Sequence, residues 1–158
     1  MFKTIIVATE NSEHDNLVFE KALSLAQLVG GQLIMLHVLS EEEEEAPTPI
    51  PNDLQELYPA VGNDNTLNMW REEWEEFKKQ GLVILRSRQE KANQVGVKAS
   101  YHQVTGSPGK TICDLAQEEE ADLIVIGHRG RSGLTEMILG SVSNYVLHHA
   151  SCSVLVVQ

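Results

Sequence analysis

Short apolar runs alternate with longer stretches of helical periodicity along most of the chain. Strand-like runs occupy residues 3–9, 32–39, 97–105, 121–126 and 153–157. Helical patterns, in which apolar residues recur every three or four positions, lie between them over residues 12–29, 66–95, 108–120 and 142–149. Because strands and helices alternate, we expect a parallel sheet with right-handed crossovers and helices on both faces.

Capping residues mark the expected starts of two of these helices. Ser12 is a favourable N-cap, and Ser107 followed by Pro108 predicts a second helix start. The segment around Ser107, TGSPGKT, also resembles the end of a phosphate-binding P-loop. Val104 stands where that motif requires glycine, so we interpret the segment as a helix start only.

The stretch from Gly127 to Ser143 leaves the carboxyl end of the fourth strand and enters the last helix. At such a place the backbone N–H groups are free and the helix dipole favours negative charge. Glycines allow a ligand to approach the main chain, and hydroxyls can cap N–H groups or contact phosphate oxygens. The stretch predicts a phosphate site, the alternative being an ordinary strand-to-helix connection. The residues concerned are Gly127, Gly130, Gly140, Ser141, Ser143 and the two cations Arg129 and Arg131.

The glycine spacing in this stretch resembles the nucleotide-binding signature of the universal stress protein family, in its ATP-binding branch. Two residues separate Gly127 from Gly130, and nine more precede the pair Gly140-Ser141. The stretch is no Rossmann GxGxxG motif and lacks a Walker lysine. The resemblance extends over nearly the whole chain, through the segments TIIVATENSE, LIMLHVL, ADLIVIGHRGRSG and SCSVLVV.

The resemblance implies one domain over residues 1–158 with a doubly wound, five-stranded parallel sheet of order 3-2-1-4-5, of the adenine nucleotide alpha hydrolase-like type. In that order the direction of winding reverses between strands 1 and 4, and ligands bind beyond the carboxyl ends of strands at such a point. The loops there start at Thr9 and at Gly127, which agrees with the phosphate site predicted from the glycines.

The resemblance also assigns roles to single residues. Ala8, Thr9 and Glu10 would line the nucleoside side, and the main chain of Val38 would meet adenine. Ile126 and Gly127 would face the ribose and Gly130 the phosphates, while Gly140, Ser141, Val142 and Ser143 would hold phosphates at the helix start. Arg129 either screens phosphate charge or points to solvent.

Glu10 stands where the family has an aspartate that faces the nucleotide. Its side chain is one methylene longer, so we expect either a contact to ribose or Mg, or a solvated turn acid. We predict no catalytic residue, because hydrolysis needs a group that orients water and usually a metal clamp. Glu10 is the only acid expected near the site.

Composition and charge narrow the classes of function. The net charge of −11 disfavours nucleic acid and anionic membranes as partners. No apolar run approaches the ~20 residues of a membrane span, and the N-terminus does not resemble a signal peptide, so we expect a cytoplasmic protein. Cys113 and Cys152 have no metal or redox spacing and are expected to be buried thiols. The six histidines show no zinc-ligand spacing.

An acidic, proline-containing insertion is expected at about residues 40–65. Twelve of the 23 acidic residues lie between Glu41 and Glu76, against one base, Arg71. We expect a solvated surface segment, which is either a spacer or lies near the nucleotide or a partner. In the helix that follows, Trp70 and Trp74 fall on the apolar stripe, where packing is favoured over ligand stacking.

The family resemblance, taken together with these patterns, implies one favoured function and leaves two alternatives. The favoured one is a regulatory stress-response protein that binds ATP, ADP or AMP, with or without Mg. It would be a homodimer, because the last strand, from Val154 to Val157, is an uncharged sheet edge that a second copy can cover. The alternatives are a slow ATP hydrolase and a protein interaction module without nucleotide.

Overall fold

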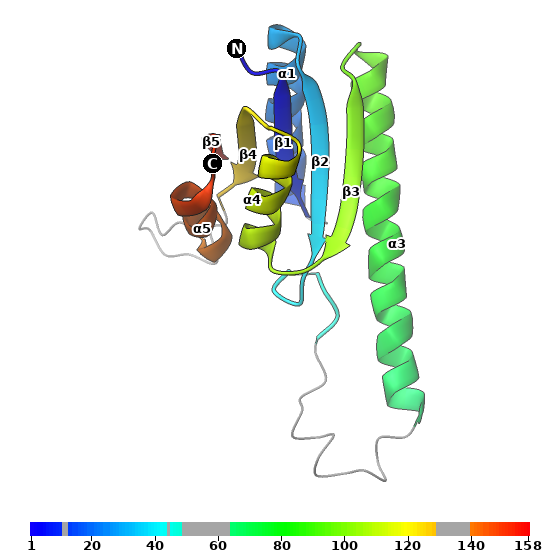
Figure 1. The fold of residues 1–158 in the computed structure, drawn as a ribbon. Coiled ribbons are helices and arrows are strands. Elements are labelled where there is room, and N and C mark those ends of the chain that lie inside the picture. Colours follow the sequence, from blue (N-terminus) through cyan, green and yellow to red (C-terminus); the bar gives the residue numbers. More distant parts are fainter. Residues whose placement is uncertain (11–12, 44, 49–63, 129–139) are drawn as a thin grey trace.

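A five-stranded parallel sheet forms the centre of the computed structural model, which describes residues 1–10, 13–43, 45–48, 64–128 and 140–158 (Figure 1). The strand order is β3-β2-β1-β4-β5, as the family resemblance implied. Every neighbouring pair of strands is parallel. The strands are β1 (Thr4–Thr9), β2 (Gln32–Leu39), β3 (Ala99–Thr105), β4 (Leu123–Gly127) and β5 (Ser153–Val157).

Four helices connect these strands within the described residues and cover both faces of the sheet. They are α1 (Glu13–Val29), α3 (Asp64–Gln94), α4 (Pro108–Glu118) and α5 (Ser141–His149). Figure 1 shows α4 in front of the sheet and α1 behind it. The topology is therefore doubly wound, and the winding direction reverses between β1 and β4.

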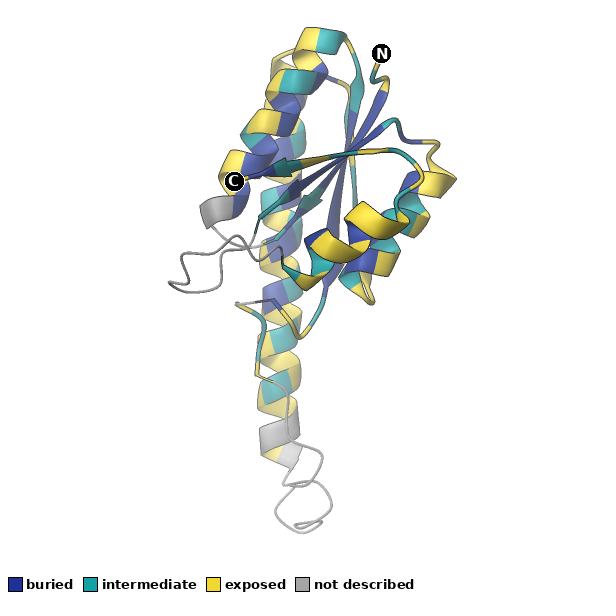
Figure 2. Ribbon diagram, turned by 90° about the vertical axis from the view of Figure 1, so that its left-hand side faces the viewer, coloured by how far each residue is buried: buried dark blue, intermediate teal, exposed yellow. Residues whose placement is uncertain are grey.

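Alternating strand residues feed two separate hydrophobic clusters, one on each face. One cluster packs alternate residues of β1 and β2, such as Val7 and Met35, against α1 and α3. The other packs the intervening residues, such as Ile6 and Leu36, against α4 and α5. Figure 2 shows the resulting band of buried strands between the helix layers. The three central strands β1, β2 and β4 are thus buried on both faces, as their continuous apolar runs predicted, whereas most residues of β3 and β5 are half-buried or exposed.

Helix α3 is much longer than the strand that it packs against. Its buried stripe follows helical spacing through Phe77, Gly81 and Leu85, as expected for core packing. Its first turns extend past the carboxyl ends of the strands (Figure 1). There the half-buried rings of Trp70 and Trp74 stack on each other, with their centroids 5.9 Å apart.

The start of β4 lies two residues later than the apolar run predicted. Ala121 and Asp122 form the turn before the strand, and the Asp122 carboxylate accepts hydrogen bonds from the N–H groups of Lys3 (2.7 Å) and Thr4 (2.9 Å). These backbone hydrogen bonds lower the pKa of Asp122. The turn therefore fastens β4 to the beginning of β1. Among the described helices, none is long and apolar enough to cross a membrane.

Candidate functional site

The carboxyl ends of β1, β2 and β4 lie side by side at one edge of the sheet. β1 pairs with β4 up to Val7 and Val125, and with β2 up to Thr9 and His37. Ala8 is half-buried, and Thr9 is buried with its hydroxyl donating to the carbonyl of Leu36 at 3.4 Å. The structure thus brings the ends of the two central strands together, where the reversal of strand order predicts a ligand crevice.

Helix α5 begins next to the end of β4. Its N-cap is Gly140, with φ −58° and ψ 158°, and a glycine has no side chain with which to cap the first turn. The Ser143 hydroxyl donates a hydrogen bond to the carbonyl of Gly127 at 3.0 Å, which ties the helix start to the strand end. The first turn of a helix leaves main-chain N–H groups without an intrahelical partner, and together with the helix dipole these donors make this end suited to an anion.

The two serines of this turn differ in what they can offer a phosphate. Ser141 is exposed, whereas Ser143 is buried and its hydroxyl hydrogen is already donated to Gly127. A phosphate oxygen accepts hydrogen bonds and does not donate them, so Ser143 would contribute its main-chain N–H. Val142 between them is half-buried and packs against the cluster on the α4 side.

Part of the predicted site lies outside the described residues, namely Arg129, Gly130 and Arg131, and so does the expected N-cap Ser12. His128 is the last described residue before that gap. Its backbone N–H donates to the carbonyl of Val157 at 2.7 Å, which extends the pairing of β4 with β5. Its ring nitrogen Nε2 is buried without a hydrogen-bond partner.

On the other side of the crevice, Val38 and Ile126 are buried near the ends of β2 and β4. Val38 lies one residue beyond the last pairing of β2 with β1 and still pairs with Val104 of β3. Its position agrees with a main-chain contact to a base, because one side of β2 has no strand neighbour at this point. Ile126 and the half-buried Gly127 follow the last β1 pairing of β4 in the same way.

A buried ion pair that the sequence did not reveal lies beneath Glu10. The Asp15 carboxylate accepts hydrogen bonds from the Glu10 backbone N–H and from Arg88 of α3 at 2.5 Å. Arg88 also donates to Asn16 at 3.0 Å and lies 5.3 Å from the Phe19 ring centroid. Burial raises the pKa of Asp15 to about 6, although Arg88 acts in the opposite direction.

This ion pair links α3 to the loop that follows β1. Asp15 lies on the apolar stripe of α1 with Val18, Phe19 and Ala22, and Arg88 continues the buried stripe of α3. A charged residue at a buried stripe position was the signal available in the sequence. Because of this ion pair, α1 and α3 hold the backbone of Glu10 in place where this half-buried residue follows β1.

An open groove lies elsewhere, between the segment after β2 and the first half of α3. Its acidic lining disfavours an anionic ligand, because like charges would repel the phosphates. The phosphate site is therefore better placed at α5 than in the groove. The groove is lined by Glu45, Pro47, Glu72, Glu73, Glu76, Phe77 and Gln80.

Comparison with known proteins decides the family. The model of the universal stress protein family matches residues 1–158. The chain belongs to the universal stress protein family. Among curated universal stress proteins, YxiE of Bacillus subtilis is 36% identical over 159 residues and the match covers 100% of both chains. Sll1388 of Synechocystis is 35% identical over an alignment of 159 positions, and the match covers 98% of this chain and 96% of that protein.

Solved structures of universal stress proteins share the fold. UspA from Lactobacillus plantarum superposes with a TM-score of 0.74 at 24% identity, over 99% of this chain and 98% of that one. A universal stress protein in complex with cAMP gives 0.64 at 22% identity, over 99% and 97%. One from Archaeoglobus fulgidus in complex with dAMP gives 0.60 at 21%, over 99% and 98%. Some universal stress proteins of this fold therefore bind adenine nucleotides.

Proposed function

We propose that this universal stress protein is a regulatory protein that binds an adenine nucleotide at the carboxyl ends of β1, β2 and β4. The observation that carries the proposal is the start of α5, which has a glycine, Gly140, as its N-cap and is held beside the end of β4 by the hydrogen bond from Ser143 to Gly127. A helix start of this kind offers N–H donors and a favourable dipole to phosphate. The cAMP and dAMP complexes of related proteins support an adenine nucleotide as the ligand.

Each part of the nucleotide would contact a different set of residues, as the family resemblance implies. The adenine would lie against the main chain of Val38, and the nucleoside side against residues 8–10. Ile126 and Gly127 would face the ribose. Gly130 and the turn from Gly140 to Ser143 would hold the phosphates, with Arg129 screening their charge.

A magnesium ion at this site would need the phosphates of the nucleotide as ligands in addition to a carboxylate of the protein. Mg²⁺ binds oxygen ligands and usually joins a nucleotide's phosphates to one or two carboxylates. Among the described residues, no group of three or more His, Cys, Asp or Glu side chains could hold a metal alone. Asp15 is engaged with Arg88. We therefore propose Glu10 as the carboxylate that would approach a phosphate-bound ion.

Titration calorimetry with ATP, ADP and AMP tests nucleotide binding. The backbone at Gly140 has φ −58°, which any residue adopts, so Gly140→Val fills space without imposing strain. We expect it to weaken binding more than tenfold, about 1.4 kcal/mol. A Gly140→Val protein that folds normally and binds ATP like wild type would contradict the site assignment.

Three outcomes, obtained from calorimetry together with a phosphate-release assay, decide between the classes of function. Wild-type protein that binds none of the three nucleotides would leave the interaction module without nucleotide as the better account. Nucleotide binding with release of phosphate that is lost in Glu10→Gln would make the protein a slow hydrolase. Binding without phosphate release is the result expected from a regulatory protein.

We also propose that the protein is a homodimer joined through the edge strand from Val154 to Val157. Among the described strands β5 pairs with β4 alone, and none of its residues is charged. Leu155 is 39% exposed, whereas Val154 and Val156 are half-buried. An apolar strand edge of this kind is normally covered, and a second copy related by a two-fold axis covers both edges at once.

A further inference from the structure

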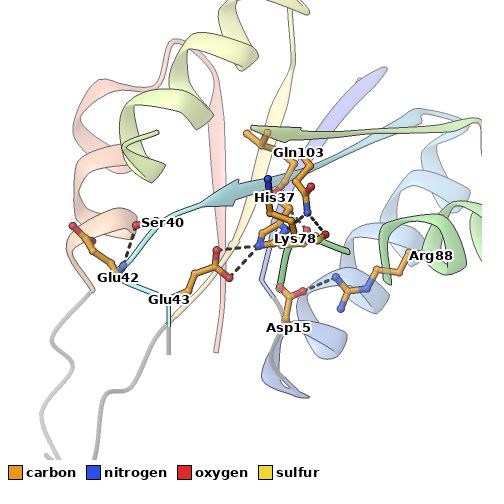
Figure 3. Close-up of polar contacts among 10 residues, drawn as sticks. Asp15, His37, Ser40, Glu42, Glu43, Lys78, Arg88 and Gln103 are labelled. Carbon is orange, nitrogen blue, oxygen red and sulfur yellow. Dashed lines mark hydrogen bonds and ion pairs between the residues drawn. The ribbon is translucent and has the colours of Figure 1, made fainter. Parts of the chain in front are cut away.

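A histidine buried at the end of β2 makes hydrogen bonds through both of its ring nitrogens. His37 is 1% exposed and lies one residue before Val38. Its Nε2 lies 2.9 and 3.1 Å from the two carboxylate oxygens of Glu43, which is itself buried. Glu43 belongs to the acidic segment that we expected to be solvated, and Figure 3 shows its carboxylate directed at the histidine ring.

The other ring nitrogen determines where the histidine carries its proton. The Gln103 side-chain nitrogen lies 3.2 Å from Nδ1 of His37 and 2.9 Å from the main-chain carbonyl of Lys78. A carbonyl only accepts hydrogen bonds, so the Gln103 atom facing Lys78 must be the NH₂ group. Its second hydrogen then points to Nδ1, which must be an unprotonated acceptor. His37 is therefore neutral, with its proton on Nε2 and donated to Glu43.

Helix α3 leaves no room for this arrangement to relax. A Cβ atom added at Gly81 would lie 2.6 Å from His37 Nδ1 and 2.7 Å from the Gln103 nitrogen. The ring of Phe77 packs edge-on against the imidazole, with centroids 5.9 Å apart. The close approach of α3 thus fixes the ring plane and the amide that selects the tautomer.

The end of β2 depends on this link because it has lost one strand neighbour. β2 pairs with β1 only as far as His37, while Val38 and Leu39 pair with β3 alone. Beyond Leu39 the chain turns at Ser40, whose carbonyl accepts the N–H of Glu43 at 3.2 Å. The bond from His37 to Glu43 closes that turn back onto the strand.

We propose that His37 is a positioning residue of the nucleotide site, which fixes the main chain of Val38 by holding the turn after β2 through Glu43. The proposal rests on the proposed function, since Val38 is the residue expected to meet adenine. Glu43 would act through His37 and the turn, without touching the nucleotide. The acidic segment would thereby be linked to nucleotide binding.

Substitution of two glutamates in the same segment separates this role from a general effect of charge. Glu43→Ala removes the acceptor, whereas Glu41→Ala removes an equal charge from an exposed position. Glu43→Gln keeps an acceptor oxygen and should rescue. By calorimetry we expect Glu43→Ala to weaken binding about fivefold relative to Glu41→Ala, and Glu43→Gln to stay within about twofold of Glu41→Ala. Equal affinities of Glu43→Ala and Glu41→Ala would overturn the proposal.

Two measurements without nucleotide test the link between His37 and Glu43 separately from the proposed function. Nitrogen NMR of wild-type histidines should show His37 with a protonated Nε2 and a bare Nδ1, and Gln103→Glu should add a proton at Nδ1. Amide exchange at Leu39 and Ser40 should be faster in Glu43→Ala than in Glu41→Ala. A charged His37 in the wild type, or unchanged exchange, contradicts the link. Absence of nucleotide binding with both signatures present would refute the proposed function and leave the link between His37 and Glu43 intact.

Discussion

The buried pair of Asp15 and Arg88 offers a stability prediction whose size follows from its geometry. The two side chains are 6% and 7% exposed, so both charges are largely removed from water. Arg88→Met keeps the length of the side chain and removes the charge. Asp15 would then be left without its cation, and its pKa, already raised to about 6, would rise further.

The expected loss depends on pH in a definite direction. An acid with a raised folded pKa favours folding below its unfolded pKa of 3.8, and that contribution disappears as pH rises through the folded value. In wild-type protein this decline stops near pH 6, where Asp15 ionises beside Arg88. In Arg88→Met the decline continues above pH 6 at about 1.4 kcal/mol per pH unit for as long as Asp15 stays protonated, so at pH 8 the electrostatic loss is at most about 3 kcal/mol. At pH 5 it is close to zero.

Urea unfolding of wild type and variant at pH 5 and pH 8 measures this difference. The loss of the hydrogen bond to Asn16 adds about 1 kcal/mol at both pH values. Lys91→Met is the matched control on the same helix, because Lys91 pairs with Glu20 at the surface. It should cost less than about 1 kcal/mol at either pH. An Arg88→Met effect that is equal at the two pH values, or no larger than that of Lys91→Met, would refute the reasoning.

Three further substitutions test other parts of the structure. Asp122→Ala removes the carboxylate that accepts the N–H groups of Lys3 and Thr4. Because the pKa of Asp122 is lowered, its contribution to folding stability should be present at pH 7 and should disappear as pH falls through that lowered value. The melting temperatures of variant and wild type should therefore differ at pH 7 and converge in acid. Gly81→Ala should lower the urea midpoint despite a helix-propensity gain of about 1 kcal/mol, because its Cβ would meet His37; an unchanged midpoint contradicts this. Val156→Lys should shift the mass in light scattering from dimer towards monomer, and an unaffected dimer would place the interface elsewhere.

The fold followed from the sequence because its signals are local and repeated. Apolar runs placed the five strands, and the glycine spacing with its family resemblance supplied their order, which the structure confirms. The errors lie at boundaries: α3 begins at Asp64, two residues before the predicted start. The late start of β4 reflects a long-range contact from Asp122 to β1, which no local pattern encodes.

The candidate site was predictable only in part for a related reason. Glycines and serines at a strand-to-helix junction indicate a phosphate site locally, and the structure places Gly127 and Ser143 in contact there. The buried polar partners come from elements far apart in the sequence: 73 residues separate Asp15 from Arg88, and 66 separate His37 from Gln103. A polar residue within an apolar stripe or run indicates from the sequence that a buried polar contact exists. Only the tertiary packing determines which residue it contacts.

The position of the nucleotide is the central claim, and amide NMR spectra recorded during a titration with ATP test it most directly. We expect the largest shifts at the carboxyl ends of β1, β2 and β4 and in the first turn of α5. We expect little change at the amino ends of β1 and β4, near Lys3 and Asp122. Shifts centred on the acidic groove around Glu72 and Glu76, or no shifts at millimolar ATP, would contradict it. The amides expected to move are those of Ala8, Glu10, Val38, Gly127, Ser141, Val142 and Ser143.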